Sequence, residues 1–396
     1  MSYPAPFVKL IGRRMQAWEA RGLTRETTPA TGLLCDLASN DYLGLTADPR
    51  VGEAAITAVE RWGTSARASR VVGGTTAIHT ELEGRLAELS GCAAGLVFSS
   101  GYTANLGVLA ALTKPSTQVV MDAHVHASLH DAAALAGVRT ALFPHQDLTA
   151  ADRMLAESSA PHKILVVEGV YSVLGDAADL ATAHEIALRH EALLIVDESH
   201  SIGVLGQGAG AARASGIAGS PAVIVTASLG KALASQGGVV LCTGPVREYL
   251  VNFARTFMFD TGVAPASAAA AHAAAGIVQD EGQRLTAELR ENAATICAAL
   301  HLEPAAAAVQ SLVFPGTSEQ AAHAAHTLRA WGIGVGCFRP PSVPDGRARL
   351  RFTATAGVDR ATLASALETV RDVLASVSSD DRAPAQPLST TGERTA

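Results

Sequence analysis

Two residues that follow apolar runs have the chemistry of a catalytic pair. Asp197 closes the run Leu193–Val196, and Lys231 follows the run Val223–Thr226 across a short turn of small residues. A lysine among small, apolar neighbours is desolvated, which lowers its pKa and makes a nucleophilic amine available. Each residue also has an ordinary explanation, because an aspartate can cap the next helix and most lysines are solvated surface charges.

Together, an acid and a lysine at neighbouring strand ends suit a pyridoxal-phosphate site. The lysine would hold the cofactor as a Schiff base, and the acid would keep the pyridine nitrogen protonated, so that the ring accepts electrons. Gly101 lies in a turn between an apolar run and a helix start, where backbone N–H groups would bind a phosphate, unless the turn is an ordinary strand–helix connection. His126 follows another apolar run and would stack on the ring. The alternative is a metal site with His124 and His130, which would need a further ligand.

Three short motifs in or near these stretches each lack part of the family pattern that they suggest. Ser228–Lys231 matches the SxxK of penicillin-recognising enzymes, but no SDN or KTG follows. Lys231 is followed by Ala232, where a P-loop needs Ser or Thr. Gly206–Gly210 has the wrong spacing for a dinucleotide fingerprint.

The elements that must position these residues are short apolar strands alternating with helices. The runs are Leu96–Ser99, Gln118–Met121, Thr140–Phe143, Ile164–Val167, Leu193–Val196, Val223–Thr226 and Val239–Cys242. Helical patterns between them cover His126–Ala136, Thr149–Ser158 and Leu180–His190. This alternation predicts an α/β fold with a mainly parallel, doubly wound sheet, and the continuous apolar runs indicate strands buried on both faces. Ligands of such folds bind at the carboxyl ends of the strands.

After Pro265 the pattern changes to that of a smaller α+β domain. Alanine-rich helices run to about Leu300. Strands are predicted at Leu312–Pro315, Ile333–Phe338 and Ala348–Thr353, and helices at Glu319–Trp331 and Asp359–Ser376. We expect an N-terminal helix and arm over 1–40 that packs with the small domain, a large cofactor-binding domain over 41–280, the small domain over 281–377, and a disordered tail over 378–396.

Composition excludes several classes of protein. Of the 396 residues, 48% are hydrophobic and 17% charged, which predicts a large core and not a disordered chain. A net charge of -7 speaks against a nucleic-acid partner. Five scattered cysteines, an N-terminus without an apolar leader and the lack of any run of ~18 strongly apolar residues predict a cytoplasmic protein without a membrane partner.

A series of motifs in one order resembles the α-oxoamine synthases, pyridoxal-phosphate enzymes of fold type I. The motifs are Ser39–Leu45, Phe98–Asn105, His126–Ser128, Glu168–Ser172, Val196–His200 and Leu229–Lys231, within a likeness that runs from about residue 35 to 375. The stretches Ser235–Gly238, Phe259–Pro265, Phe338–Pro344 and Arg349–Arg351 are most similar to the biotin-pathway branch of the family. The resemblance implies a seven-stranded type of sheet with a smaller α+β C-terminal domain.

The resemblance also implies a role for each motif residue. Lys231 would hold pyridoxal phosphate, Asp197 would pair with the pyridinium nitrogen, and His126 would stack on the ring and contact substrate. Further cofactor contacts would come from Gly101, Tyr102, Ser172, His200, Ser228 and Thr261. Thr261 would reach the phosphate of the partner subunit in a homodimer whose active sites lie at the interface. Substrate contacts would come from Asn40 and Arg351, which hold the amino-acid carboxylate, and from Arg25 and Ser342 along the acyl-thioester path.

The implied reaction is a decarboxylative condensation of L-alanine with pimeloyl-CoA, or with the corresponding carrier-protein thioester. Alternatives are the family reactions of glycine with acetyl-CoA or serine with a long-chain acyl-CoA, and an aminotransferase or aldolase on the same fold. A cofactor-binding scaffold without activity is a further alternative, against which the intact Lys231, Asp197 and His126 argue. The segment Gly63–Arg70 carries small side chains where the family is glycine-rich, and Ser199 and Ala209 also depart from the family pattern. The segment Gly63–Arg70 and Ala209 bear on acyl-chain specificity more than on the cofactor chemistry.

Overall fold

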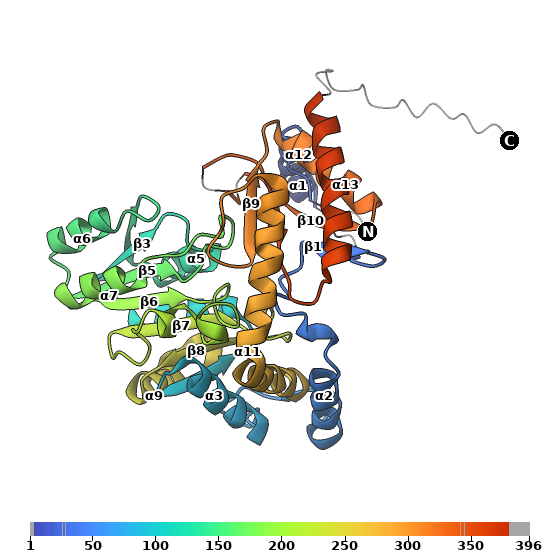
Figure 1. The fold of residues 1–396 in the computed structure, drawn as a ribbon. Helices are drawn as coiled ribbons and strands as arrows, with labels where there is room; N and C mark the ends of the chain where they lie inside the picture. The colour runs from blue at the N-terminus through green and yellow to red at the C-terminus, as the bar shows by residue number, and fades with distance from the viewer. Residues whose placement is uncertain (1–3, 26, 28, 341, 344, 380–396) are drawn as a thin grey trace.

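Seven apolar strands form the larger of two sheets in the computed structural model, which describes residues 4–379 except 26, 28, 341 and 344 (Figure 1). The strands are β2 (Ala94–Phe98), β3 (Thr117–Asp122), β4 (Arg139–Phe143), β5 (His162–Glu168), β6 (Leu193–Asp197), β7 (Val223–Ser228) and β8 (Gly238–Cys242). Their order is β2-β8-β7-β6-β5-β3-β4. β8 runs in the direction opposite to the other six strands, so its pairings with β2 and β7 are antiparallel. Every strand predicted for this sheet is therefore confirmed, as is the mainly parallel arrangement.

Both faces of this sheet are covered, as the continuous apolar runs predict. On β5, Ile164 and Val166 belong to one buried cluster, and Leu165 and Val167 belong to the other. One face is covered by α4 (Gly101–Leu112), α5 (Ala127–Ala136), α9 (Gly244–Phe253) and α10 (Arg255–Met258). The other face is covered by α3 (Ala77–Ser90), α6 (Leu148–Glu157), α7 (Leu180–Arg189) and the start of α11 (Pro265–Leu300), with α2 (Pro49–Trp62) packed outside α11. This is the doubly wound arrangement.

The register of the central strands places acidic side chains together at one edge of the sheet. Glu168, the last residue of β5, pairs with Asp197, the last residue of β6. Asp197 in turn pairs with Thr226 on β7. Since these strands are parallel, their carboxyl ends share an edge, and the turn that follows β7 brings Lys231 to the same place.

A second sheet of four strands has the order β1-β10-β11-β9. Its members are β1 (Cys35–Leu37), β9 (Val309–Val313), β10 (Ile333–Phe338) and β11 (Arg349–Thr353), and the helices α12 (Ser318–Ala330) and α13 (Arg360–Ser379) pack nearby. The strand predicted at Leu312–Pro315 begins three residues earlier, because Ala307, Ala308 and Val309 are buried and Pro315 cannot continue a ladder. β1 pairs parallel with β10, so a strand from the N-terminal arm is part of the C-terminal sheet.

The two sheets are connected by α11, one helix of 36 residues where several helices were expected. It packs against α2 and α3 at its start and against α13 and β9 further along, and Figure 1 shows it running beside both sheets. The boundary predicted after residue 280 lies inside this helix, so the division into domains stays a prediction. The expected N-terminal helix is α1 (Ala5–Glu19), which has no buried residue. The tail predicted over 378–396 lies almost wholly outside the described residues. Among the residues that the structure describes, no helix is long and apolar enough to cross a membrane.

Candidate active site

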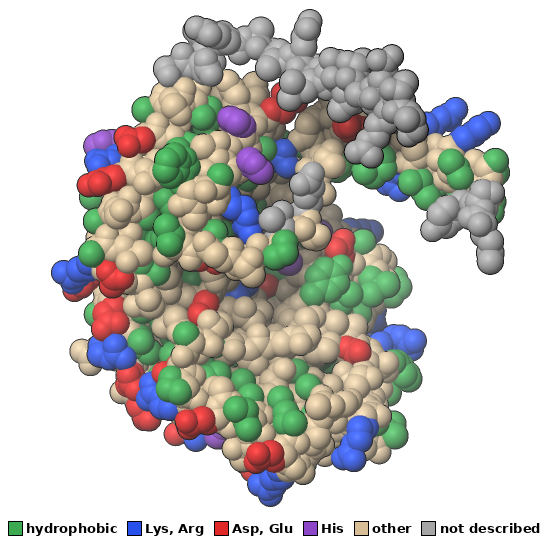
Figure 2. Space-filling model, turned by 90° about the vertical axis from the view of Figure 1, so that its right-hand side faces the viewer, with side chains coloured by type: hydrophobic (Ala, Val, Ile, Leu, Met, Phe, Trp, Pro, Cys, Tyr) green, Lys and Arg blue, Asp and Glu red, His purple; other side chains and the backbone are tan. Residues whose placement is uncertain are grey.

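The carboxyl ends of β5, β6 and β7 surround a cavity of about 240 Å³, here called the lysine cavity. The predicted residues that line it are Gly101, Tyr102, His126, Asp197, His200, Ser228 and Lys231. Residues that sequence reasoning had not assigned also line it: Ser100, Asn105, Ser128, Glu168 and Ser199. Seen from the side, the molecule is hollowed between its upper and lower parts (Figure 2).

Lys231 is held in the turn after β7 with its amine beside a histidine. Its Nζ lies 2.8 Å from Nε2 of His200. Burial lowers the pKa of Lys231 to about 8, although the carboxylates of Asp197 and Glu168 oppose the shift. Burial, followed by the charge of Lys231, also lowers the pKa of His200. The surroundings therefore raise the fraction of the neutral amine, which is the nucleophilic and basic form of a lysine.

Asp197 is buried and its two oxygens are oriented by separate donors. The backbone N–H of Ser199 donates to Oδ1 at 2.9 Å, and Nδ2 of Asn105 donates to Oδ2 at 2.8 Å. The hydroxyl of Thr226 donates to Oδ1 of Asn105 at 2.6 Å, which fixes the amide orientation. Turns and not a helix follow Asp197, so the helix-cap interpretation is not supported. A carboxylate held in this way can pair with a cation placed in the lysine cavity.

Glu168 is a second buried acid, and sequence reasoning missed its role. Its Oε1 accepts the backbone N–H of His126 at 2.5 Å, and its Oε2 accepts the backbone N–H of Ser172 at 3.1 Å. Burial, followed by the charge of Asp197, raises the pKa of Glu168 well above its ordinary value. The available signal was its position, because it closes β5 as Asp197 closes β6. It fixes the segment that carries His126.

His126 caps the start of α5 and presents its ring to the lysine cavity. Its Nδ1 lies 2.8 Å from Oγ of Ser128, so the ring orientation is fixed from behind. The outer part of the ring is exposed, while the protein behind it lowers the pKa of His126 by burial. A neutral imidazole with one free edge can stack on an aromatic ring or donate a hydrogen bond.

The start of α4 offers an anion site at the floor of the lysine cavity. Ser100 caps the helix and Gly101 is its first residue, so the N–H groups of the first turn point toward the cavity. A Cβ on Gly101 would lie 3.1 Å from Cβ of Ser228, which requires a small residue here. Oγ of Ser228 accepts the backbone N–H of Gly230 at 3.2 Å. A phosphate fits this site, and together with Lys231 and Asp197 it completes what pyridoxal phosphate needs.

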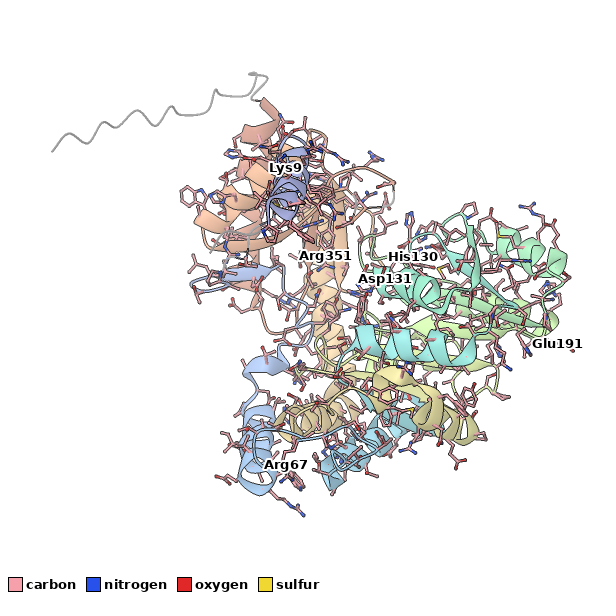
Figure 3. The ribbon with its side chains drawn as sticks, turned by 180° about the vertical axis from the view of Figure 1, so that it is seen from behind. Lys9, Arg67, His130, Asp131, Glu191 and Arg351 are labelled. Atoms are coloured by element: carbon pink, nitrogen blue, oxygen red, sulfur yellow. The ribbon has the colours of Figure 1, made fainter. Side chains whose placement is uncertain are left out.

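Asn40 and Arg351 are brought together but lie outside the lysine cavity. Arg351, on β11, donates to Oδ1 of Asn40 at 2.9 Å and to the carbonyl oxygen of Ser172 at 2.8 Å. Figure 3 shows Arg351 on the side of the small sheet, facing the region of His130 and Asp131 on α5. Of the predicted carboxylate-binding pair, Arg351 therefore comes from the four-stranded sheet and Asn40 from the segment that follows β1.

A chain of hydrogen bonds connects this pair to the lysine. Nδ1 of His200 lies 2.5 Å from the hydroxyl of Tyr42, which is completely buried. The same hydroxyl lies 3.2 Å from Oδ1 of Asn40. The sequence Lys231, His200, Tyr42, Asn40 and Arg351 is thus continuous. Sequence reasoning quoted Tyr42 within a motif but assigned it no role.

Arg25 and Ser342 line a second cavity of about 650 Å³. His126 lines both cavities, whereas Ser172, predicted to contact the cofactor, lines the second one and not the lysine cavity. Nη2 of Arg25 donates to Oγ of Ser342 at 3.0 Å. We call this 650 Å³ cavity the second cavity.

Tyr102, which lines the lysine cavity, donates to Oδ2 of Asp131 at 2.7 Å. Among the described residues, no group of His, Cys, Asp and Glu is placed to hold a metal ion.

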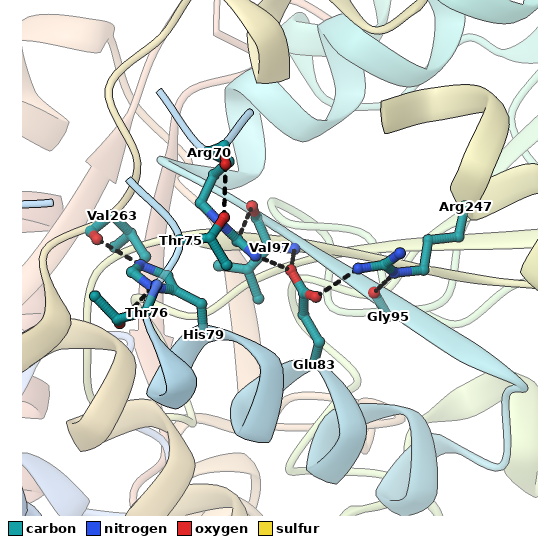
Figure 4. A network of polar contacts seen from close by, with 9 residues as sticks. All are labelled: Arg70, Thr75, Thr76, His79, Glu83, Gly95, Val97, Arg247 and Val263. Carbon is teal, nitrogen blue, oxygen red and sulfur yellow. Dashed lines mark hydrogen bonds and ion pairs between the residues drawn. The ribbon is translucent and has the colours of Figure 1, made fainter. Parts of the chain in front are cut away.

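The segment that departs from the family pattern is anchored by a buried ion pair (Figure 4). Nη2 of Arg70 donates to Oε1 of Glu83 at 2.8 Å, and both side chains are almost fully buried. The other carboxylate oxygen of Glu83 accepts from Arg247 at 3.0 Å, and Oε1 also accepts the backbone N–H of Val97. The pair ties the segment to α3 and to the edge strand β2.

This segment also positions Thr261, which is exposed and lines neither cavity in the single chain. The backbone N–H of Gly262 donates to the carbonyl oxygen of Ala68 at 3.0 Å. Arg67 has a left-handed backbone with φ of 66°. Glycine adopts that conformation without steric cost, so a glycine-rich family pattern has a physical reason here.

Comparisons with known proteins agree with this site. A family model described as aminotransferase class I and II matches residues 34–370, and the chain belongs to that family. An 8-amino-7-oxononanoate synthase of Mycobacterium sp. (strain KMS) is 46% identical over 358 residues, covering 90% of this chain and 94% of that protein. The protein of the same name from Mycobacterium avium (strain 104) is 44% identical over 364 residues, covering 91% of this chain and 95% of that protein.

Solved structures of two kinds are also similar. A serine palmitoyltransferase from S. paucimobilis with a bound PLP–myriocin aldimine has a TM-score of 0.84 and 28% identity, covering 96% of this chain and 100% of that chain. An 8-amino-7-oxononanoate synthase from Francisella tularensis has a TM-score of 0.70 and 26% identity, covering 86% of this chain and 98% of that chain. The α-oxoamine synthase resemblance, the fold type and pyridoxal phosphate as cofactor are confirmed.

Proposed function

We propose that this chain catalyses the reaction for which its mycobacterial relatives are named. L-Alanine condenses with a pimeloyl thioester to give 8-amino-7-oxononanoate, and the thiol and CO2 are released, as in biotin synthesis. The observation that carries the proposal is the identity of 46% over 90% of the chain with a protein of that name. The site supports it, because the lysine, the buried acid and the histidine that such chemistry needs line one cavity.

Pyridoxal phosphate, when bound, supplies an electron sink that stabilises negative charge on the α-carbon of the amino acid. Gly101 and Ser228 would hold its phosphate, and Asp197 would hold the proton of its ring nitrogen. Lys231 would attach it and afterwards remove the α-proton. A pKa of about 8 suits that task, because a useful fraction of the amine is neutral at physiological pH and the protonated form remains accessible.

The amino acid would be oriented by its carboxylate. Arg351 presents a guanidinium that already contacts Asn40, and such a fork binds a carboxylate through two parallel hydrogen bonds. His126 lies where the lysine cavity and the second cavity meet. As a neutral imidazole it would donate a hydrogen bond to the thioester oxygen as negative charge develops there.

The acyl thioester would enter through the second cavity. That cavity is larger than the lysine cavity, at about 650 Å³ against about 240 Å³, and its walls include Val173, Leu174 and Phe338. The new carbon–carbon bond forms between the α-carbon and the thioester carbonyl. The thiol leaves, the original carboxylate is lost as CO2, and a proton returns to the α-carbon.

The test is release of free thiol from a panel of amino acids and acyl thioesters. We expect the highest kcat/KM with L-alanine and a pimeloyl thioester on CoA or on a carrier protein. A preference for serine with a long-chain acyl-CoA would support a second candidate function, which the TM-score of 0.84 with serine palmitoyltransferase favours. A preference for glycine with acetyl-CoA, or a keto acid formed without thiol release, would contradict the proposal.

We also propose that the chain forms a homodimer with active sites at the interface. Three apolar side chains of α1, those of Phe7, Ile11 and Met15, are between 53% and 60% exposed. Thr261 is exposed and lies outside the lysine cavity of its own chain, so it could contact a cofactor phosphate only if that cofactor is bound by a partner subunit. Light scattering should give twice the chain mass of 40.5 kDa.

The five free cysteines support a cytoplasmic location.

A further inference from the structure

Two stacked histidines lie at the second cavity, His124 in its wall and His145 behind it. Nδ1 of His124 has no hydrogen-bond partner among the described residues. His124 and Tyr171 both line that cavity, and His145 packs between them from behind. The rings of His124 and His145 are stacked, with centroids 4.0 Å apart and planes 13° apart. His145 meets the ring of Tyr171 edge-on at 4.5 Å. The stacking on His145 therefore fixes the plane of the His124 ring.

His145 is locked between two carboxylates. Its Nδ1 lies 2.9 Å from Asp122 and its Nε2 lies 2.8 Å from Asp176. Burial alone would lower the pKa of His145, but the hydrogen bonds and charges of the two carboxylates outweigh burial and raise it to about 9. His145 is thus an imidazolium at neutral pH, and Gln146 adds a backbone N–H to Asp122 at 2.8 Å.

His124 rests on this imidazolium and is itself neutral. Burial, and next the charge of His145, lower its pKa, while Asp122, Asp176 and Asp345 oppose the shift. Its Nδ1 is buried and has no hydrogen-bond partner among the described residues. A neutral imidazole carries one proton, and a buried N–H without an acceptor is rarer in proteins than a buried acceptor without a donor, so we place the proton on Nε2. His124 lines the second cavity, and its Nε2 has no hydrogen-bond partner among the described residues.

The charges around His124 select the kind of acceptor. Two carboxylates, those of Asp122 and Asp176, surround one imidazolium, and Asp345 is already paired with Arg349 at 2.7 Å. The excess charge is negative, so a further carboxylate near His124 would be repelled. An uncharged carbonyl oxygen has no such penalty and accepts one N–H well.

We propose that Nε2–H of His124 donates a hydrogen bond to an uncharged carbonyl oxygen of the acyl thioester in the second cavity. This proposal rests on the proposed function, because it assumes that an acyl thioester enters there. The oxygen belongs either to the thioester itself or to an amide of the thiol arm. Asp122, His145 and Asp176 act as positioning residues that hold His124 in its orientation.

The test compares His124→Phe, which keeps a ring to stack on His145 but has no donor, with His124→Gln, which keeps a donor. We expect His124→Phe to raise KM for pimeloyl-CoA about tenfold, which is the loss of one good hydrogen bond, with kcat and KM for L-alanine within about twofold of the wild type. His124→Gln should recover part of that loss. His162→Phe, at an exposed position at the start of β5, is the matched control. Melting temperature and cofactor absorbance show whether each variant is folded.

Changes in the donor locate the oxygen. If the penalty of His124→Phe persists with an ethanethiol thioester, the acceptor is the thioester oxygen, and if it appears only with CoA, the acceptor is an amide of the thiol arm. A penalty that vanishes when pimeloyl-CoA is replaced by heptanoyl-CoA would place the far carboxylate at His124 and overturn the proposal. So would unchanged KM values with every donor.

Failure of this inference and failure of the proposed function give different results. If the wild type releases no thiol from any acyl thioester, the proposed function fails. If the wild type is active and His124→Phe is equally active, only the role of His124 fails. Calorimetric titration with a non-reactive thioether analogue of pimeloyl-CoA gives a binding readout that is independent of turnover, and there too we expect about tenfold weaker binding by His124→Phe.

Discussion

The lysine cavity and the second cavity are built in different ways. In the lysine cavity the polar groups are bonded to one another, as in the chain from Thr226 through Asn105 to Asp197. In the second cavity, apolar side chains such as Val173 and Leu174 form much of the wall, and Nδ1 of His124 has no hydrogen-bond partner among the described residues. The lysine cavity is thus organised before any ligand arrives, whereas the second cavity, although Arg25 and Ser342 are bonded to each other there, keeps a histidine that a ligand can contact.

This difference separates chemistry from selection. A change in the preorganised cavity removes a group for which no substitute is available, so its effects should be large and independent of the acyl donor. A change in the second cavity should alter the affinity for the acyl donor by the value of single contacts. The effects should therefore decrease from the lysine and acid of the lysine cavity to groups that contribute single hydrogen bonds.

Replacing Lys231 by Ala should give the largest loss. The substitution removes both the group that attaches the cofactor and the base that takes the α-proton, so we expect thiol release to fall by at least about 10⁴-fold. The visible absorbance of the attached cofactor should also disappear. Lys114→Ala, which changes an exposed lysine, is the control and should behave as the wild type. A yellow, active Lys231→Ala variant would remove the basis for the whole site.

Replacing Asp197 by Asn tests the buried acid with the smallest change in shape. Losing one partner of a buried ion pair costs roughly 3–5 kcal/mol, which corresponds to a fall in kcat of about 10² to almost 10⁴-fold. The loss should be equal for every acyl donor, because Asp197 does not face the second cavity. Asp280→Asn, at an exposed position of α11, is the control. A loss that depends on the acyl chain would contradict the separation of the two cavities.

The pH dependence of cofactor attachment tests the state of Lys231 in the apoprotein. Only the neutral amine attacks an aldehyde, and the pKa of Lys231 is lowered to about 8. Attachment should therefore slow below pH 8 and level off above it, rising about 100-fold in total between pH 6 and pH 10. Stopped-flow absorbance measures the rate, with Nα-acetyl-lysine as the reference for a solvated amine. A rate that still rises steeply above pH 9 would show that burial does not perturb Lys231.

The elements that repeat a simple pattern could be predicted from the sequence. The strands β5, β6 and β7 are largely uninterrupted apolar runs. Asp197 at the end of β6 and Lys231 shortly after β7 are thereby placed at the carboxyl edge of the sheet. The role of Glu168 was accessible by the same logic, since it ends the strand beside Asp197.

Other features depend on tertiary contacts that no local pattern encodes. The donor from Asn105 reaches Asp197 across 92 positions in the chain, and the stack of His124 on His145 joins two loops. The single helix α11 was missed because its alanine-rich pattern contains Gly276 and Gly282, which interrupt the signal. In the structure, a Cβ on Gly282 would lie 2.2 Å from the carbonyl oxygen of Gln207, so a close contact and not a break explains that glycine.

Replacing Arg351 by Lys should affect the amino acid more than the acyl donor. Lysine keeps the charge but cannot make two parallel hydrogen bonds to a carboxylate. We expect KM for L-alanine to rise about 10- to 100-fold, the value of one or two charged hydrogen bonds, while KM for pimeloyl-CoA stays within about twofold. Arg360→Lys, on the exposed start of α13, is the control. Equal increases in both KM values would mean that Arg351 does not distinguish the two substrates.

Tyr42→Phe should give the smallest effect, and it tests whether the two parts of the preorganised site communicate. The hydroxyl of Tyr42 lies 2.5 Å from His200 and 3.2 Å from Asn40, so its loss interrupts the chain between Lys231 and Arg351 without removing either end. One neutral hydrogen bond corresponds to a change of about 2- to 10-fold in kcat/KM for L-alanine. Because Nδ1 of His200 would lose its partner while Nε2 still contacts Lys231, the pH at which Lys231 captures the cofactor should also shift, which a purely structural role would not produce. Tyr249→Phe, whose hydroxyl contacts only the carbonyl oxygen of Ala111 among the described residues, is the control. If Tyr42→Phe changes kcat/KM but leaves that pH unchanged, the hydroxyl only orients Asn40, and the carboxylate-binding pair acts independently of the lysine.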